Sequence, residues 1–323
     1  MTQLINQKRE APWIGIGVQG QWDDYREALH AAQLDFEVEA KDAKVEIDNL
    51  SIWPGSQGGM VTYETVPGVQ VNVMEGSNKI LGCVSTQYGI IQNEQAFSLL
   101  EPFTAAGGVI TNAGMTEQGL VFMVLRMRQS VILGDDYDFD VMCTNSFNGA
   151  FACGLIIVPT RIICQNMYRR LMGNNDSMLS VRHGRWAPER LQAANHATGK
   201  MLTFQAAFEA QLGNANSINL TYQRIQMDIL PILFPYPKPG GPREAMSYER
   251  VDQMREEFMD VYYNAPDNLK FHGKAMGFIN AYYDYLSHRS PGKMMPGRWD
   301  HRRLSGLVSG DAVKVKAIKE AMS

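Results

Sequence analysis

Apolar and polar residues alternate along the first half of the chain, a period typical of β-strands with one solvated face. The stretch FEVEAKDAKVEI (36–47) alternates in this way, and VQVNVMEGSNKILGCV (69–84) contains two apolar runs around a Gly-Ser-Asn turn. Residues 107–133 predict further strands around an Asn-Ala-Gly turn at 112–114, followed by an Asp-rich loop at 135–140. A Gly/Pro-rich loop is expected at 51–64.

Helical spacing appears early in two short stretches and dominates after residue 161. Residues 22–32 predict a helix that begins near Asp23 or Asp24, and 93–108 predict a helix capped by Asn93 and stopped at Gly107. Later helices are expected over 164–174, 187–213, 248–266 and 275–289, with Pro188 in a first turn and Gly213 as a terminator. Strands first and helices second predict an α+β fold. The PYPKPGGP stretch predicts a division into domains 1–235 and 236–323.

Composition places the chain among soluble globular proteins, because 45% of its residues are hydrophobic and 20% are charged. The apolar runs are too short to span a bilayer, and the N-terminus lacks the apolar stretch of a secretion signal. We therefore expect a cytoplasmic protein without a membrane partner. Four widely spaced cysteines, Cys83, Cys143, Cys153 and Cys164, are expected to remain structural thiols.

The net charge of −4 conceals a gradient along the chain. Residues 1–160 hold 8 Lys or Arg against 19 Asp or Glu, whereas residues 161–200 hold 7 against 2 and residues 289–323 hold 8 against 3. Such asymmetry indicates a polyanion or an acidic protein as partner. The alternative is that the basic stretch neutralises the acidic half of the same fold.

Catalytic motifs give weak signals. GIGVQG (15–20) matches a dinucleotide fingerprint in letters only, because no βαβ unit surrounds it. A Cys164–His183 pair and a cation-binding loop at Asp135–Asp140 leave an unrecognised enzyme as one hypothesis. Scattered histidines do not suggest a metal cage, so no metal and no cofactor are expected, and a non-enzymatic function is favoured.

Arginine dominates the basic stretch, and its guanidinium forks onto phosphate. Trp186, beside Arg185, could stack on a base, and Arg190 belongs to the same stretch. In the region 143–172 the amide side chains accompany the basic ones, although Asn145, Gln165 and Asn166 could equally satisfy buried backbone groups at a strand–helix junction. For Asn145 we favour that structural role. The predicted nucleic-acid site comprises Arg161, Gln165, Asn166, Arg169, Arg170, Arg182, His183, Arg185 and Lys200.

Several motifs carry a resemblance to a known family. They are Asn145-Ser146, Asn148-Gly149, the run RIICQN at 161–166 and Arg182-His183, together with an N-terminal APWIGIGVQ. Over residues 10–235 the chain resembles phage/plasmid-like proteins with the domain of unknown function 932. Asn148 stands where the family pattern has Asp, and both residues tolerate a turn. The chain is also similar, more distantly, to phage single-strand annealing proteins.

These resemblances imply a phage or plasmid origin and a curved antiparallel sheet followed by a helix that carries basic residues into a groove. They supply no catalytic residues. The function expected is binding or annealing of single-stranded DNA in recombination or replication, by a homo-oligomer whose basic groove holds the backbone. The alternative is a phage protein–protein effector or structural protein that docks a host or phage protein on its acidic half.

Overall fold

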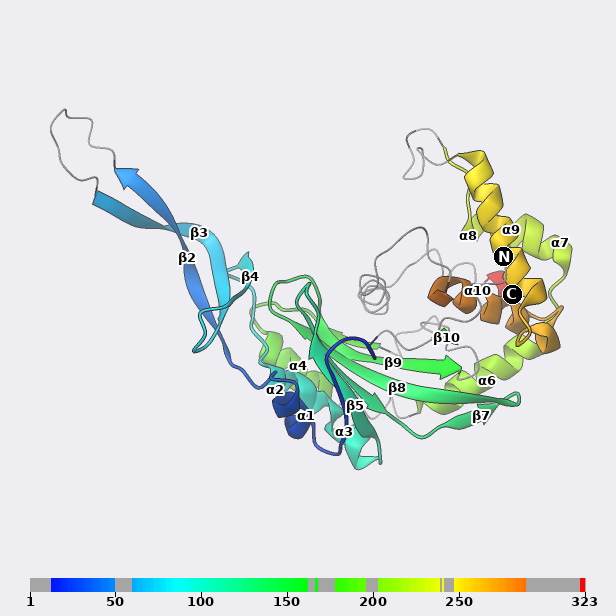
Figure 1. Cartoon of the computed structure of the whole chain (residues 1–323), viewed down its shortest axis with the longest axis horizontal. Helices are drawn as coiled ribbons and strands as arrows, with labels where there is room; N and C mark the ends of the chain where they lie inside the picture. The colour runs from blue at the N-terminus through cyan, green and yellow to red at the C-terminus, as the bar shows by residue number, and fades with distance from the viewer. Residues whose placement is uncertain are drawn as a thin grey trace.

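The structure is a computed structural model that describes residues 13–49, 60–161, 166–167, 178–195, 203–238, 240, 247–288 and 320–322. Two antiparallel sheets occupy the N-terminal and middle parts of the chain, and most of the helical residues follow them (Figure 1). The predicted α+β class is confirmed.

The larger sheet has eight strands, ordered β1-β5-β6-β8-β9-β10, with β7 paired to β8 and β11 to β9. The strands are β1 (Val18–Trp22), β5 (Val109–Met115), β6 (Leu120–Arg126), β7 (Ser130–Ile132), β8 (Asp135–Ser146), β9 (Cys153–Arg161), β10 (Asn166–Met167) and β11 (Met178–Val181). Antiparallel neighbours that follow one another in sequence need only short turns, which explains the dense turn residues of this half. The core strands β6 and β8 are buried almost throughout.

Helices cover one face of this sheet, where Val121, Met123 and Leu125 join the main core. Between β1 and β5 the chain forms α1 (Tyr25–Ala31), α2 (Asn93–Phe97), the 3-10 helix η1 (Ser98–Leu100) and α3 (Glu101–Ala105), and after β11 it forms α4 (Ala187–Asn195) and α6 (Phe204–Ser217). Alternate residues of the same strands, such as Phe122 and Val124, form a second cluster with Trp13 on the opposite face. Both faces of the central strands are therefore buried.

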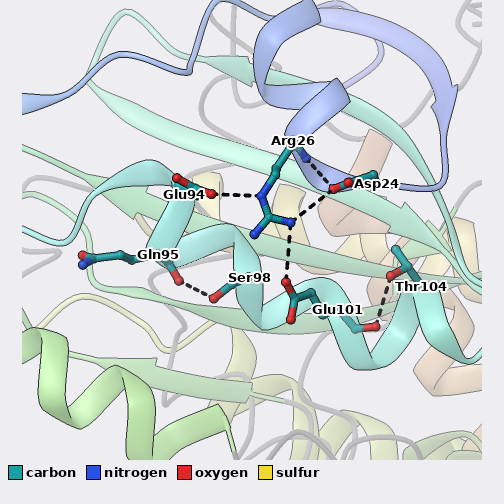
Figure 2. Close-up of polar contacts among 7 residues, drawn as sticks. All are labelled: Asp24, Arg26, Glu94, Gln95, Ser98, Glu101 and Thr104. Carbon is teal, nitrogen blue, oxygen red and sulfur yellow. Dashed lines mark hydrogen bonds and ion pairs between the residues drawn. The ribbon is translucent and has the colours of Figure 1, made fainter.

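Arg26 of α1 joins the two helical segments at the edge of this core. Its Nε lies 2.9 Å from the Glu94 carboxylate of α2, and its Nη1 lies 3.8 Å from that of Glu101 in α3 (Figure 2). Asp24 is the N-cap of α1, as predicted, and its carboxylate accepts a hydrogen bond from the Arg26 backbone N–H. Part of the acidic charge of the first half is thus neutralised locally.

The smaller sheet is a long arm that projects from the body of the molecule (Figure 1). It consists of β2 (Val38–Asn49), β3 (Met60–Met74) and β4 (Ile80–Ser85), ordered β2-β3-β4. The alternation in β2 predicted one solvated face, but exposed residues lie on both faces along most of the strand. The predicted loop at 51–64 lies outside the described residues up to position 59, and its last residues belong to β3.

The C-terminal part packs helices against one another. It contains α7 (Tyr222–Arg224), the π-helix η3 (Ile225–Ile229), α8 (Leu230–Leu233), α9 (Tyr248–Asn264), the 3-10 helix η4 (Leu269–Phe271) and α10 (Ala275–His288). The ring of Phe234 lies 5.9 Å from that of Phe258 and 5.5 Å from that of Tyr285, so aromatic packing crosses residue 235. The predicted division into two domains at that residue stays a prediction.

Two glycines that predicted a turn and a helix end, Gly114 and Gly213, lie inside a strand and a helix instead. Residues 112–114 lie inside β5, and a Cβ on Gly114 would lie 2.7 Å from the Cα of Gly17. That glycine permits close approach of two backbones, and the turn falls instead at Thr116–Gly119. Gly213 lies within α6, which continues to Ser217 because Leu212 and Ala215 remain buried.

Three further local expectations are corrected. The Asp-rich stretch 135–140 is the beginning of β8 and not a loop. Asn166 and Met167 form β10 and pair with β9, so the helix expected at 164–174 does not include them, and the rest of that range lies outside the described residues. Asn93 is the first residue of α2 and not its N-cap; its buried amide donates to the Leu34 carbonyl oxygen.

Candidate nucleic-acid interface

A short exposed basic segment, residues 182–190, connects β11 to the first turn of α4. Arg182, Arg185 and Arg190 are exposed, and the Trp186 side chain among them is 61% exposed. Trp186 and Arg190 lie one helical turn apart, because the Arg190 N–H donates to the Trp186 carbonyl oxygen. No side chain of the described part forms an ion pair or a hydrogen bond with the three guanidinium groups. Within the described part, therefore, nothing neutralises these three charges.

The fold holds this segment at both ends. On its N-terminal side β11 pairs with β9, where Val181 lies opposite Cys153. On its C-terminal side Ala187 and Leu191 of α4 are buried, 0% and 5% exposed. In between, the Gly184 carbonyl oxygen comes so near Gly89 that a Cβ there would lie 2.2 Å away. The segment is therefore a supported ridge, and its exposed side chains project from a fixed backbone.

His183 points away from the exposed arginines. Its ring stacks on Tyr88, with 4.7 Å between centroids, and its Nδ1 lies 3.2 Å from the Gly89 carbonyl oxygen. Burial lowers the pKa of His183, so the imidazole is neutral near pH 7. The structure thus places His183 as an anchor beneath the ridge, not beside the arginines with which the sequence grouped it.

The end of β8, Asn145 and Ser146, lies near the same ridge and helps to hold its surroundings. Tyr88, on which His183 stacks, donates its hydroxyl to the Ser146 carbonyl oxygen at 2.7 Å. Asn145 is fully buried, and its Nδ2 donates to the Ile91 carbonyl oxygen and to Oδ1 of Asn93. This matches the structural role favoured for Asn145.

The side chains of the other predicted site residues lie outside the described part of the chain. Gln165, Arg169, Arg170 and Lys200 lie outside the described residues. The backbone of Arg161 ends β9 and pairs with that of Asn166 in β10, but their side chains are also outside the description. Of the nine predicted residues, Arg182 and Arg185 have described, exposed side chains. Arg190 and Trp186 also belong to the ridge, although the predicted site left them out. Their position in sequence next to the arginine cluster could have indicated them.

A second charged cluster lies on the sheet and is neutralised from within. Arg126 of β6 lies opposite Asp140 of β8, and its Nε and Nη2 donate to that carboxylate at 2.9 and 3.1 Å. Asp138 lies 3.3 Å from the same guanidinium, and Lys270 binds Asp135 at 2.7 Å. Burial raises the pKa of Asp140 to about 6, although Arg126 opposes that shift. Among the described residues, no group of three or more His, Cys, Asp or Glu could hold a metal ion.

Two of the described cysteines are buried thiols. Cys143 and Cys153 are free and buried, and burial raises the pKa of both thiols, that of Cys153 to about 12. Cys83 is free and exposed, and Cys164 lies outside the described residues. A buried thiol with a raised pKa is a poor nucleophile. Tyr262 of α9 and Tyr282 and Tyr283 of α10 are buried, so these rings serve packing and are not a platform for stacking bases.

A hollow between α7 and α9 has the opposite charge to the ridge. Its walls include Tyr222, Tyr236 and Tyr263 together with the carboxylates of Asp252, Glu256 and Asp260, and one guanidinium, that of Arg255. Arg255 is already engaged, because it lies over the Tyr236 ring and donates to the Phe234 carbonyl oxygen. Three carboxylates would repel a phosphate backbone, so aromatic exposure alone does not make this hollow a second interface.

Comparison with known proteins places the chain in a family. The model of the domain of unknown function DUF932 matches residues 80–318, more than half of the chain. The chain belongs to the DUF932 family. The match extends beyond residue 235 and leaves out residues 1–79, whereas the resemblance had been placed at 10–235. Neither curated proteins nor solved structures gave a match. Within the described part of this DUF932 protein, no helix could span a membrane.

Proposed function

We propose that this DUF932 protein binds single-stranded DNA without catalysing a reaction on it, and promotes annealing in phage or plasmid recombination or replication. The observation that carries the proposal is the ridge at 182–190. There, three arginines without partners among the described residues flank an exposed tryptophan. Guanidinium groups bind phosphates and an indole ring stacks on any base, so the combination suits a strand whose sequence is not read.

The fixed backbone of the ridge supports the proposal further. Side chains that project from a supported segment lose less conformational freedom on binding than side chains on a loose loop. The neutral, buried His183 and the hydrogen bonds of Tyr88 hold this backbone from below. Annealing requires that bases stay accessible while phosphates are held, and a narrow ridge meets that requirement better than a deep pocket.

Salt-dependent binding tests the proposal. The full chain is titrated with a labelled oligonucleotide of about 30 nucleotides, between about 50 and 200 mM salt. We expect the logarithm of affinity to fall linearly with the logarithm of salt concentration. Replacing Arg182, Arg185 and Arg190 together by Ala should lower that slope by about 2, since each phosphate contact to a single strand contributes about 0.7.

The matched control removes three exposed cationic groups elsewhere, at Lys79, Arg128 and Lys238, and should leave the slope unchanged. The loss in the ridge variant should be similar for oligonucleotides of different sequence. An unchanged slope in the ridge variant, or no binding of the parent chain at low salt, refutes the proposal. In the second case, capture of a protein from a nuclease-treated lysate would favour the effector alternative.

A further inference from the structure

The outer edge of β2, in the projecting arm, is a second candidate binding surface. It would bind a protein strand and not nucleic acid. Strand β2 has one neighbour among the described strands, β3, and beyond Val38, which the Gln92 side chain binds, no described strand pairs with its other edge. Most of its residues are exposed, including Val45 at 51%. Two-stranded ribbons are marginally stable in water, and an unpaired edge is a template for another strand.

The backbone of β2 is suited to accept that strand. At its base Gln92 binds both backbone groups of Val38: the Val38 N–H donates to Oε1 at 3.0 Å, and Nε2 donates to the Val38 carbonyl oxygen at 2.8 Å. The carbonyl oxygen of Glu37 faces the other way, toward β3, where it accepts from Glu75 N–H. Because these directions alternate along a strand, the even-numbered residues after Val38 present their N–H and C=O groups to the open edge.

The irregularity in the arm lies on β3 and leaves β2 continuous. Between the pairs Asp42–Gln70 and Lys44–Thr65, β2 contributes one residue and β3 contributes four. Those four include Pro67 and Gly68, the latter at φ +76. The outer edge of β3 is therefore interrupted, whereas β2 offers a continuous edge after Val38, from residue 39 to residue 49.

We propose that the open edge of β2 binds β2 of a second copy of this chain, antiparallel, about a two-fold axis beside Ala43. Opposite side chains in an antiparallel pair point to the same face, so the axis must pass beside a residue and not between two. If the axis passed beside Asp42 or Lys44, that charged side chain would lie opposite the same residue of the second copy. If the axis passed beside Val45, Asp42 of each copy would lie opposite Asp48 of the other. If the axis passes beside Ala43, Asp42 of each copy lies opposite Lys44 of the other, and no like charges lie opposite each other.

The Ala43 register also satisfies the hydrogen-bonding pattern. Asp42 and Lys44 are both even-numbered, so their outward backbone groups meet as a hydrogen-bonded pair, and Ala43 meets its copy as a non-hydrogen-bonded pair. Lysines along an edge strand normally prevent indiscriminate pairing. An axis beside Ala40 would also set opposite charges against each other, Glu39 against Lys41, but it would place Asp42 opposite Val38, whose outward backbone groups Gln92 already binds. Charges and free backbone groups together therefore favour the Ala43 register, and a strand without matching carboxylates is repelled. This assembly does not depend on the ridge at 182–190.

Two charge-reversal variants, measured alone and mixed, test the proposal. The full chain is used, after nuclease treatment. Sedimentation should show self-association of the parent chain, and Asp42→Lys or Lys44→Asp should each weaken it about tenfold or more, since two opposite-charge pairs become like-charge pairs. Mixing the two variants should restore association, because each lysine then meets an aspartate. The double variant D42K/K44D should associate like the parent. Both positions are exposed, so the fold should tolerate the changes.

The matched control makes the same charge changes, Glu75→Lys and Lys79→Asp, in the β3–β4 turn of the same sheet, and should leave association unchanged. A cysteine test fixes the register. In a chain with Cys83→Ser, Ala43→Cys should form an intermolecular disulfide under mild oxidation, whereas Lys44→Cys should not, because only position 43 meets its own copy. A monomeric parent chain, failure of the mixed variants to reassociate, or equal cross-linking at the two positions overturns the proposal.

Discussion

His183 lies flat on Tyr88, with their ring planes 8° apart and their centroids separated by 4.7 Å. Tyr88 in turn donates its hydroxyl to the Ser146 carbonyl oxygen. The stack therefore connects the segment before α2, the turn between β8 and β9, and the basic ridge. Its integrity determines whether the arginines of the ridge keep their positions.

Acidification should weaken the fold through this histidine. Burial lowers the pKa of His183, so below the unfolded value of about 6.5 the unfolded chain binds more protons than the folded one. Stability should fall as pH falls below about 6.5 and level off below the folded pKa. The replacement His183→Phe keeps an aromatic ring but cannot be protonated. Urea denaturation at about pH 7.5 and 5.5 should show a smaller acid-dependent loss in this variant than in the parent.

The control for that experiment is His30→Gln at an exposed histidine, which keeps the acid-dependent loss because His183 is still present. An equal loss in the His183→Phe chain and the parent would show that protonation of His183 does not couple to unfolding.

Two arginines in ion pairs should differ in their contribution to stability. Asp140 is 1% exposed, so Arg126→Met leaves a buried carboxylate without its partner and should lower the free energy of unfolding by about 3 kcal/mol. Arg26 and its partner Glu94 are more than half exposed, so Arg26→Met should cost less than about 1 kcal/mol. Urea denaturation at neutral pH measures both. Adding Asp140→Asn to Arg126→Met should recover part of the loss, and equal costs for the two single variants would contradict this explanation.

Trp186 should contribute to oligonucleotide affinity by stacking. Trp186→Ala should weaken binding by about 1–3 kcal/mol, and Trp186→Phe should retain most of the affinity because a ring remains. Tyr222 is 59% exposed but lies among carboxylates, so Tyr222→Ala is the matched control and should leave affinity unchanged. Fluorescence anisotropy of a labelled oligonucleotide gives all three values. If Trp186→Ala and Tyr222→Ala lowered affinity equally, the oligonucleotide would not bind specifically at the ridge.

Asn145 should be important for stability and not for binding. Asn145→Ala leaves the buried Ile91 carbonyl oxygen and the Asn93 amide oxygen without their donor, a cost of about 2 kcal/mol. Asn148 also forms hydrogen bonds, because its Nδ2 donates to the Gln118 carbonyl oxygen and its Oδ1 accepts from the Ala150 N–H, but both bonds are exposed, so Asn148→Ala should cost about 1 kcal/mol or less. If Asn145→Ala leaves the unfolding midpoint unchanged but abolishes oligonucleotide binding, the structural assignment of this residue is wrong.

Local patterns predicted element types better than element ends. The helix begun by Asp24 and the turn between β3 and β4 follow from signals a few residues long, and both were confirmed. The turn expected at 112–114 was wrong because a glycine required by a neighbour 97 residues earlier in the chain, Gly17, looks the same as a turn glycine. Similarly, Asp138 and Asp140 look like a solvated loop until β6 brings Arg126 opposite them.

For the candidate site, the sequence alone determined that cationic side chains gather after residue 160 and that an aromatic ring lies among them, because composition is local. Tertiary structure decided that His183 turns inward and that Arg182, Arg185 and Arg190 stay exposed. It also decided that one edge of β2 has no partner among the described strands. Burial and pairing depend on which distant segments the sheet register brings together, and no short stretch of sequence encodes that register by itself.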